Sequence, residues 1–402
     1  MTIPDGVSAG SAVDAGYESL VGLVMGTAEL PAGELHEVVD AAGRLLGADS
    51  ARLLVADYGL LTLQELGADG PTGDRQAIDG TLAGRALVQD EVVVHGTDPA
   101  IVSVPLADGH ELMGVFELTH PAWTDDLLDV LEPVVRLLAL VLISKRRYTD
   151  VVHRTRRVKP LSVAAELQWD LLPPLACTTA CVSVSGILEP AYSIGGDSFD
   201  YAMNEDRVAF AIVDAVGHGM PAVLLSTSAI NCLRNARREG ADLAAAYRAA
   251  GDVIETEFGH SYFVTAQLGS LAFDTGELTW LNAGHPPPLL VRDCTYLGEL
   301  ACAPSLPMGL GGLVREVATE RLQRGDRILF YTDGVTEMRS PEGNEFGTDR
   351  LADFLVRATL DRVSPAETVR RLSASVVAYN EEGRTDDATL MLLEYHGPRG
   401  RQ

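Results

Sequence analysis

Four short segments between residues 195 and 389 share one pattern: an aspartate beside a glycine or another aspartate lies next to a strand-like apolar run. The clearest case is the nearly continuous apolar run from Arg207 to Ala215, which carries Asp214 at its tip, as expected of a buried strand. A chain with this pattern must form several strands, each with a carboxylate at its end. The four acidic segments are Gly195-Gly196-Asp197-Ser198-Phe199-Asp200, Asp214-Ala215-Val216-Gly217-His218-Gly219, Thr332-Asp333-Gly334 and Asp386-Asp387-Ala388-Thr389.

Aspartates gathered in this way repel one another unless cations lie between them. Hard divalent cations such as Mg²⁺ and Mn²⁺ prefer carboxylate, carbonyl and water oxygens. Two such ions about 3.5–4 Å apart can activate a water and clamp a phosphoryl group for in-line attack. A single Asp-Gly pair is more often a turn than a ligand, but the complete set of four favours a metal site.

The charge of the chain narrows the classes of partner. Acidic side chains outnumber basic ones 57 to 31 over 402 residues, for a formal net charge of -26. This field repels phosphate backbones and anionic membranes, so we expect neither nucleic acid nor membrane as a partner. The N-terminus lacks a basic segment followed by an apolar one, and the most apolar stretch, Leu137 to Ile143, is far short of the about 20 residues of a membrane helix. We therefore expect a cytoplasmic protein.

The first part of the chain is predicted to be mixed α/β. Apolar spacing predicts a helix from Glu34 to Leu46, and Thr124 is a good N-cap for a long helix that carries a stripe of apolar residues. That stripe is either a core contact or a dimer seam. The predicted strands are Ala51–Ala56, Ile101–Leu106 and Leu112–Leu118, and the stripe consists of Leu127, Leu131, Val134, Leu138 and Leu142.

This first part resembles a GAF domain over about Tyr17 to Arg147. The resemblance rests on Asp79-Gly80-Thr81-Leu82-Ala83-Gly84-Arg85-Ala86, then Val104-Pro105-Leu106, then Met113-Gly114-Val115-Phe116-Glu117-Leu118, in that order. It implies a domain that binds a small-molecule ligand, answers to an upstream regulator or dimerises. A ligand-free dimerising spacer is the alternative, and we expect a homodimer.

The second part resembles the PPM-type, metal-dependent serine/threonine phosphatases of the RsbU and SpoIIE group, over about Leu161 to Tyr395. Besides the four acidic segments, the match includes Leu167-Gln168-Trp169-Asp170-Leu171-Leu172-Pro173, Asn282-Ala283-Gly284-His285-Pro286-Pro287-Pro288 and Tyr331-Thr332-Asp333-Gly334-Val335-Thr336-Glu337. The resemblances together imply an α+β chain: a GAF-like α/β domain, a helical linker and a PPM-type αββα β-sandwich. We place a tail at 1–16, the GAF-like domain at 17–147, the linker at 148–176, the phosphatase domain at 177–397 and a tail at 398–402.

The resemblance also implies the residues of the active site. It assigns Asp197, Asp214, Asp333, Asp386 and the backbone carbonyl of Ala215 to two Mn²⁺ or Mg²⁺ ions. Asp214 would bridge both ions, Asp333 and Asp386 would complete one site, and Asp197 and the Ala215 carbonyl would serve the other mainly through waters. The expected catalytic residues are Asp214, Asp333 and Asp386.

The implied substrate is a phosphorylated STAS-domain anti-sigma factor antagonist, whose dephosphorylation frees it to capture its anti-sigma kinase in a sigma-factor partner-switching pathway. GAF control of this activity is part of the expectation. Two alternatives stay open: a non-catalytic phosphatase-like sensor or binding protein, and a phosphatase that acts on another phosphorylated substrate.

The remaining reactive side chains favour structural interpretations. His218 is either a general acid or a residue that holds a glycine-rich turn, and the second is favoured. We expect His285 to order its loop, and Asp200 and Asp387 to support the ligands or to end strands. Cys232 and Arg238 have the spacing of thiolate phosphatases, but they lie within a predicted helix without glycine, so the match is read as coincidence.

Overall fold

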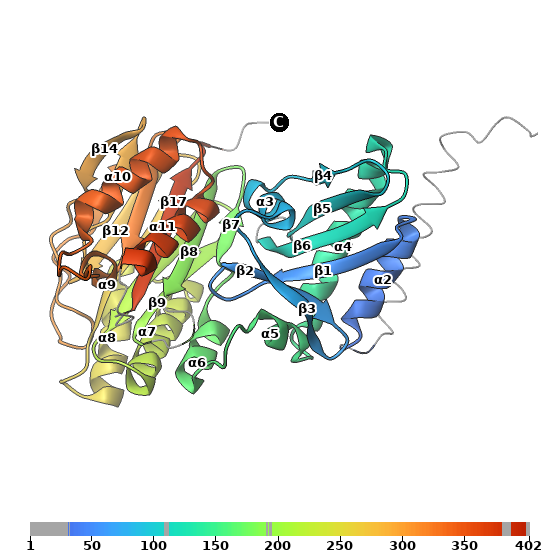
Figure 1. Cartoon of the computed structure of the whole chain (residues 1–402). Helices are drawn as coiled ribbons and strands as arrows, with labels where there is room; N and C mark the ends of the chain where they lie inside the picture. Colours follow the sequence, from blue (N-terminus) through green and yellow to red (C-terminus); the bar gives the residue numbers. More distant parts are fainter. Residues whose placement is uncertain are drawn as a thin grey trace, which may run out of the picture. The chain divides into compact units, whose positions relative to one another are not determined.

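The computed structural model describes residues 31, 33–107, 112–189, 192, 195–379 and 387–398. These residues divide between Val158 and Lys159 into two compact units (Figure 1), each with its own sheets and core. The expected α+β organisation, an α/β domain followed by a β-sandwich domain, is confirmed. Among the described residues, no helix has both the length and the apolar character needed to cross a bilayer.

The first unit is built on one six-stranded antiparallel sheet in the order β3-β2-β1-β6-β5-β4. Its inner strands β1 and β6 are buried on both sides because helices cover both faces of the sheet. The strands are β1 (Ser50–Ala56), β2 (Thr62–Gly67), β3 (Gly70–Ala77), β4 (Val93–His95), β5 (Ala100–Ala107) and β6 (Leu112–His120).

Alternate residues of β1 show how the two faces are divided. Leu53 and Val55 pack in the larger core with α2 (Leu35–Leu45) and α4 (Leu128–Lys145). Leu54 packs in the smaller core under α3 (Leu82–Gln89). A strand of period two thus serves two cores at once.

The position of the long helix α4 decides whether its apolar stripe is a core contact or a dimer seam. Four of the five residues of its apolar stripe are buried in the domain core, so the stripe is a core contact: Leu131, Val134, Leu138 and Leu142. Thr124 occupies the N-cap position of the 3-10 helix Asp125–Leu127, which leads directly into α4, but its side chain makes no capping hydrogen bond. Pro133 lies within α4 and does not interrupt it.

The segment between the two domains contains two helices, one in each unit. Helix α5 (Val151–Arg156) belongs to the first unit, where Arg75 donates hydrogen bonds to the carbonyls of Thr155 and Arg157, and Arg156 donates to the carbonyl of Ala56. Helix α6 (Val163–Leu171) belongs to the second unit and packs on α7 (Met220–Arg238).

The second unit is a sandwich of two antiparallel sheets, which we call the β10 sheet and the β17 sheet. The β10 sheet has the order β15-β12-β11-β10-β9, and the β17 sheet has the order β14-β13-β16-β17-β8-β7. The β10 sheet consists of β9 (Asp197–Met203), β10 (Arg207–Ala215), β11 (Val264–Ala272), β12 (Glu277–Ala283) and β15 (Ala318–Arg321). The β17 sheet consists of β7 (Ala176–Thr178), β8 (Val182–Glu189), β13 (Leu289–Arg292), β14 (Thr295–Glu299), β16 (Arg327–Tyr331) and β17 (Ala388–Tyr395).

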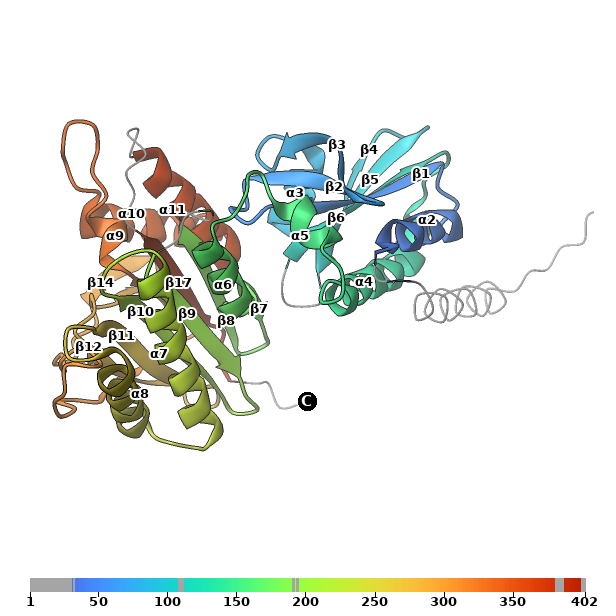
Figure 2. The ribbon, with the colours of Figure 1, turned by 90° about the horizontal axis from the view of Figure 1, so that it is seen from below.

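Helices cover the outer face of each sheet, so the unit has four layers (Figure 2). Helices α7 and α8 (Leu243–Phe258) pack on the β10 sheet, whereas α10 (Gly347–Leu360) and α11 (Pro365–Tyr379) pack on the β17 sheet. Between the sheets, the rings of Phe210 on β10 and Phe330 on β16 lie 4.8 Å apart. This is the expected αββα arrangement.

Candidate active site

Strand β10 delivers Asp214 to the space between the two sheets. Ala211, Val213 and Ala215 of this strand pack against the helices, so Phe210, Ile212 and Asp214 face the other sheet. Asp214 lies directly opposite Asp197 in the antiparallel register of β10 and β9. Two carboxylates therefore stand side by side at one end of the sandwich.

The β17 sheet meets this pair with a hydroxyl. Thr332, the residue after β16, is fully buried, and its Oγ1 donates a hydrogen bond of 2.6 Å to Oδ2 of Asp197. The same Oγ1 accepts a hydrogen bond of 2.9 Å from the backbone N–H of Thr389 on β17. Thr332 thus joins the first strand of one sheet to the last strand of the other at the acidic end.

A third carboxylate comes from the start of β17. Oδ1 of Asp387 accepts a hydrogen bond of 2.8 Å from the backbone N–H of Gly195, two residues before Asp197. A Cβ atom on Gly195 would lie only 2.1 Å from the other carboxylate oxygen of Asp387, so this approach requires a glycine. Asp387 is therefore a support of the acidic end, as expected.

The electrostatics of this cluster are unfavourable to three bare carboxylates. Burial raises the pKa of Asp197 well above its usual value, and the charges of Asp214 and Asp387 raise it further. Hydrogen bonds from Thr332 and Thr389 act in the opposite direction. Burial and neighbouring carboxylates disfavour the charged form of this acid. A hard cation bound among these carboxylates would stabilise the charged form.

The carbonyl of Ala215 lies in the same place. The N–H of Ala215 donates to the carbonyl of Gly196, and a Cβ atom on Gly196 would lie 2.3 Å from the Ala215 oxygen. Only a glycine before Asp197 leaves room for that oxygen. The available donors are therefore carboxylate and carbonyl oxygens, which fit Mg²⁺ or Mn²⁺ and do not fit a thiolate-seeking metal.

The structure brings together most, but not all, of the expected site residues. Asp197, Asp214 and Ala215 share one end of the β10 sheet, and Asp333 begins the short helix α9 (Asp333–Thr336) directly after Thr332. Asp386 lies outside the described residues. Within the part that is described, no three carboxylate, imidazole or thiolate side chains converge closely enough to hold a metal by themselves.

Two residues of the cluster were missed from sequence. Thr332 and Thr389 belong to quoted segments, yet their role depends on the packing of two sheets, which spacing along the chain does not reveal. The only available signals were the position of Thr332 directly before Asp333 and of Thr389 three residues after Asp386.

The other reactive residues lie in structural settings. Asp200 points to the helix side of β9 and pairs with Arg234 and Arg237 of α7, at 2.7 and 2.8 Å. His218 is exposed between two glycines with positive φ. Cys232 lies inside α7, where burial raises the pKa of its thiol and disfavours the thiolate, which agrees with coincidental spacing.

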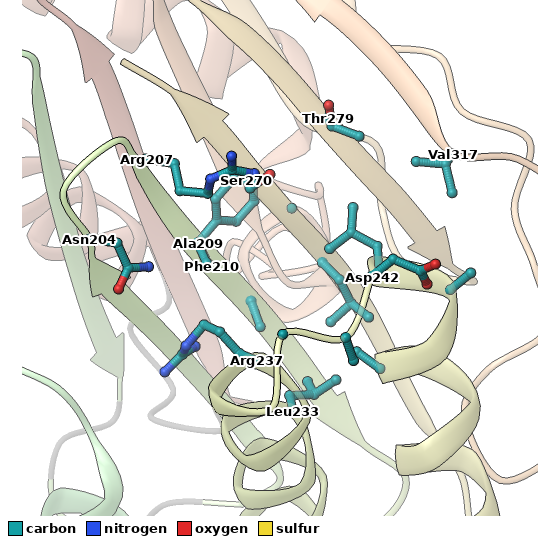
Figure 3. A pocket seen from close by; sticks show the side chains of 18 residues that line it. Asn204, Arg207, Ala209, Phe210, Leu233, Arg237, Asp242, Ser270, Thr279 and Val317 are labelled. Carbon is teal, nitrogen blue, oxygen red and sulfur yellow. The ribbon is translucent and has the colours of Figure 1, made fainter. Parts of the chain in front are cut away.

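A cavity of about 660 Å³ opens between the β10 sheet and the α7–α8 pair (Figure 3), but the acidic cluster is elsewhere. The cavity begins at Arg207, the end of β10 opposite to Asp214. Its floor includes Ala209, Ser270 and Thr279, and its arginines have acidic partners: Arg207 pairs with Asp206 and Arg237 with Asp200. The chemistry of the acidic end is therefore not the chemistry of this cavity.

Comparison with known families agrees with both domains. Residues 204–396 match the family described as Stage II sporulation protein E (SpoIIE), and residues 32–142 match the GAF domain. The phosphoserine phosphatase RsbU of Bacillus subtilis is 22% identical over 290 residues, which cover 69% of this chain and 83% of RsbU. Protein IcfG of Synechocystis is 24% identical over 267 residues, which cover 58% of this chain and 41% of IcfG.

Among solved structures, the RsbU and RsbW domains of a Mycobacterium tuberculosis protein are similar with 30% identity and a TM-score of 0.46, over 55% of this chain and 61% of that one. The SiaA-PP2C domain of Pseudomonas aeruginosa is 21% identical with a TM-score of 0.49, over 57% of this chain and 94% of that one. The two family matches show that the chain carries a SpoIIE-type phosphatase domain over residues 204–396 and a GAF domain over residues 32–142.

Proposed function

We propose that Asp197, Asp214, Asp333, Asp386 and the carbonyl of Ala215 hold two Mn²⁺ or Mg²⁺ ions for the hydrolysis of a phosphoprotein. The ions supply a lowered pKa for attacking water and neutralise charge on the phosphoryl group. Asp214 would contribute to both metal positions, and Asp333 and Asp386 would contribute to one of them. The observation that carries the proposal is the buried Asp197, held beside Asp214 and Asp387 at a seam between two sheets.

The chain's own groups fix the geometry that such a site needs. Thr332 holds one oxygen of the buried Asp197 by a hydrogen bond of 2.6 Å, next to Asp214 on the paired strand. Gly196 lets the Ala215 carbonyl approach. Because both contacts are set by backbone positions in paired strands, the ligands are positioned before any ion or substrate arrives.

For the substrate, we propose a phosphorylated STAS-domain anti-sigma factor antagonist in a partner-switching pathway, with the GAF domain controlling the rate. Support comes from the similarity to RsbU and to RsbP of Bacillus subtilis, both named phosphoserine phosphatases. We further propose that the protein acts in the cytoplasm as a homodimer.

The test combines a general substrate with a specific one. Phosphate release from p-nitrophenyl phosphate, and from each phosphorylated STAS-domain protein of the source cell, is measured with Mn²⁺ and with EDTA. We expect turnover with Mn²⁺ only, and a loss of at least about 100-fold in Asp214→Asn and Asp333→Asn. Asp206→Asn is the matched control, because its carboxylate is exposed on the turn between β9 and β10.

The outcomes separate the alternatives. Mn²⁺ binding without any turnover would support a non-catalytic sensor instead. Turnover of p-nitrophenyl phosphate with none of the STAS-domain proteins would point to another phosphorylated substrate. Full activity of Asp214→Asn in EDTA would refute the metal site.

A further inference from the structure

His285 is a buried imidazole that the proposed function does not use. It lies in the loop after β12, where it is 4% exposed. Its Nδ1 is hydrogen bonded to Oγ1 of Thr265 at 2.8 Å. Its Nε2 is buried and makes no hydrogen bond of normal geometry within the described part of the chain. A polar ring is rarely buried so deeply unless its contacts matter.

The loop is built to hold this ring in one orientation. The side chain of Asn282 accepts from the N–H of His285 at 2.8 Å and donates to its carbonyl at 2.9 Å. Gly284 has a positive φ of 72°, which turns the chain between these two residues. The side chain of Gln267 donates to the carbonyl of Pro286 at 3.0 Å and fixes the far side of the loop.

The ring lies next to the proposed metal site from both sheets. Thr265, its partner on β11, is directly opposite Asp214 in the register of β10 and β11. The backbone of Tyr331, the last residue of β16, also lies within reach of the ring and raises its pKa slightly against the effect of burial. Tyr331 precedes Thr332 and Asp333. One side chain thus contacts the strand neighbour of Asp214 and the strand that presents Asp333.

The ring is neutral at physiological pH. Burial lowers the pKa of His285 to about 3, so its role is not to donate a proton to a leaving group or to add positive charge. What it offers is a neutral ring, hydrogen bonded to Thr265 on one sheet and close to the backbone of Tyr331 on the other.

We propose that His285 is a positioning residue that, through Thr265 and the end of β16, holds Asp214 and Asp333 at the separation that two bound cations require. The proposal rests on the metal site proposed above. It differs from loop ordering alone, because it makes the cation affinity of the site depend on the hydroxyl–imidazole contact.

The test removes this contact with the smallest possible change. Thr265→Val removes the hydroxyl and keeps the shape, Thr265→Ser keeps the hydroxyl, and His285→Asn keeps a polar atom near the position of Nδ1. Mn²⁺ binding to the full chain is titrated by electron paramagnetic resonance of the free ion. Hydrolysis of p-nitrophenyl phosphate is measured across Mn²⁺ concentrations.

We expect Thr265→Val to raise the Mn²⁺ dissociation constant about tenfold, the lower end of the range for partners of metal ligands. At saturating Mn²⁺, its kcat and its KM for p-nitrophenyl phosphate should return close to the wild-type values. Thr265→Ser should bind Mn²⁺ like the wild type, and His285→Asn should lie between the two.

A second hydroxyl–imidazole contact supplies the control. Oγ of Ser183 and Nε2 of His396 are hydrogen bonded at 2.8 Å, at the end of the β17 sheet away from Asp387. Ser183→Ala removes the same kind of contact and should leave Mn²⁺ binding unchanged.

Wild-type Mn²⁺ affinity in a folded Thr265→Val chain would overturn the role of His285 and leave the metal site standing. Equal weakening in Thr265→Ser and Thr265→Val would also overturn it, because the hydroxyl would then be irrelevant. Failure of the wild type to bind Mn²⁺ would instead refute the metal site itself.

Discussion

The buried imidazole of His285 should make the phosphatase domain sensitive to acid. Its pKa is lowered from 6.5 to about 3 in the folded chain. Between these values the unfolded chain takes up a proton on this histidine that the folded chain does not. The contribution of the neutral ring to the free energy of unfolding is therefore present in full above pH 6.5 and is lost as the pH falls toward 3. Each pH unit in this window costs about 1.4 kcal/mol, which amounts to roughly 5 kcal/mol over the whole window.

The measurement compares the wild type with His285→Asn, which has no titrating ring. At each pH from 7 to 4.5, the free energy of unfolding by urea is followed through the fluorescence of Trp280, which is 2% exposed on β12. Both chains carry Trp123→Phe and Trp169→Phe, so that no other indole contributes. EDTA is present throughout.

The cavity left by the asparagine lowers stability at every pH, so only the pH dependence of the difference is diagnostic. The advantage of the wild type at pH 7 should shrink by about 2.7 kcal/mol at pH 4.5. A difference between the two proteins that stays constant from pH 7 to 4.5 would refute the reasoning, since the ring would then titrate equally in both states.

Three further changes test the acidic end and its surroundings. Asp197→Asn should weaken Mn²⁺ binding at the one site that it serves, yet stabilise the metal-free protein by about 0.5–2 kcal/mol at pH 7, an advantage that disappears near pH 4, in thermal unfolding with EDTA. Gly196→Ala should lower activity at least about tenfold by displacing the Ala215 carbonyl. Gly251→Ala on α8 should not, because the added Cβ would lie 3.5 Å from its nearest neighbour, the backbone nitrogen of Gly309, which is an ordinary contact distance; phosphate-release assays decide. Asp200→Asn should destabilise the domain by about 2–4 kcal/mol in urea, with Mn²⁺ affinity unchanged.

Much of the fold could be predicted where one physical signal dominates. The strand Arg207–Ala215 has the predicted bounds, because it is a nearly continuous apolar run. Strand β3 was missed, since Gly70, Pro71 and Gly73 have low strand propensity and only pairing with β2 makes them a strand.

The acidic residues of the site could be predicted from the sequence, but the side chains that hold them in place could not. The segments around Asp197 and Asp214 identify carboxylates at strand ends, and the register of β9 and β10 places them opposite each other. The hydroxyl of Thr332 and the ring of His285 lie between two stacked sheets, and the residues that they contact are far away in the sequence. Local patterns contain no information on which side chains two stacked sheets bring into contact.

The pairing of β8 with β17 has a consequence for the synthesis of the enzyme. Val182–Glu189 and Ala388–Tyr395 lie side by side along their full length, although almost two hundred positions of chain separate them. While the ribosome is still translating the chain, β9 and β10 can form a hairpin. The hydroxyl of Thr332, which bonds to Asp197, and the amide of Thr389, which bonds to Thr332, have not yet emerged at that stage. We therefore expect a nascent chain to stay inert until β17 has been translated and has docked, so that premature dephosphorylation by unfinished copies does not occur.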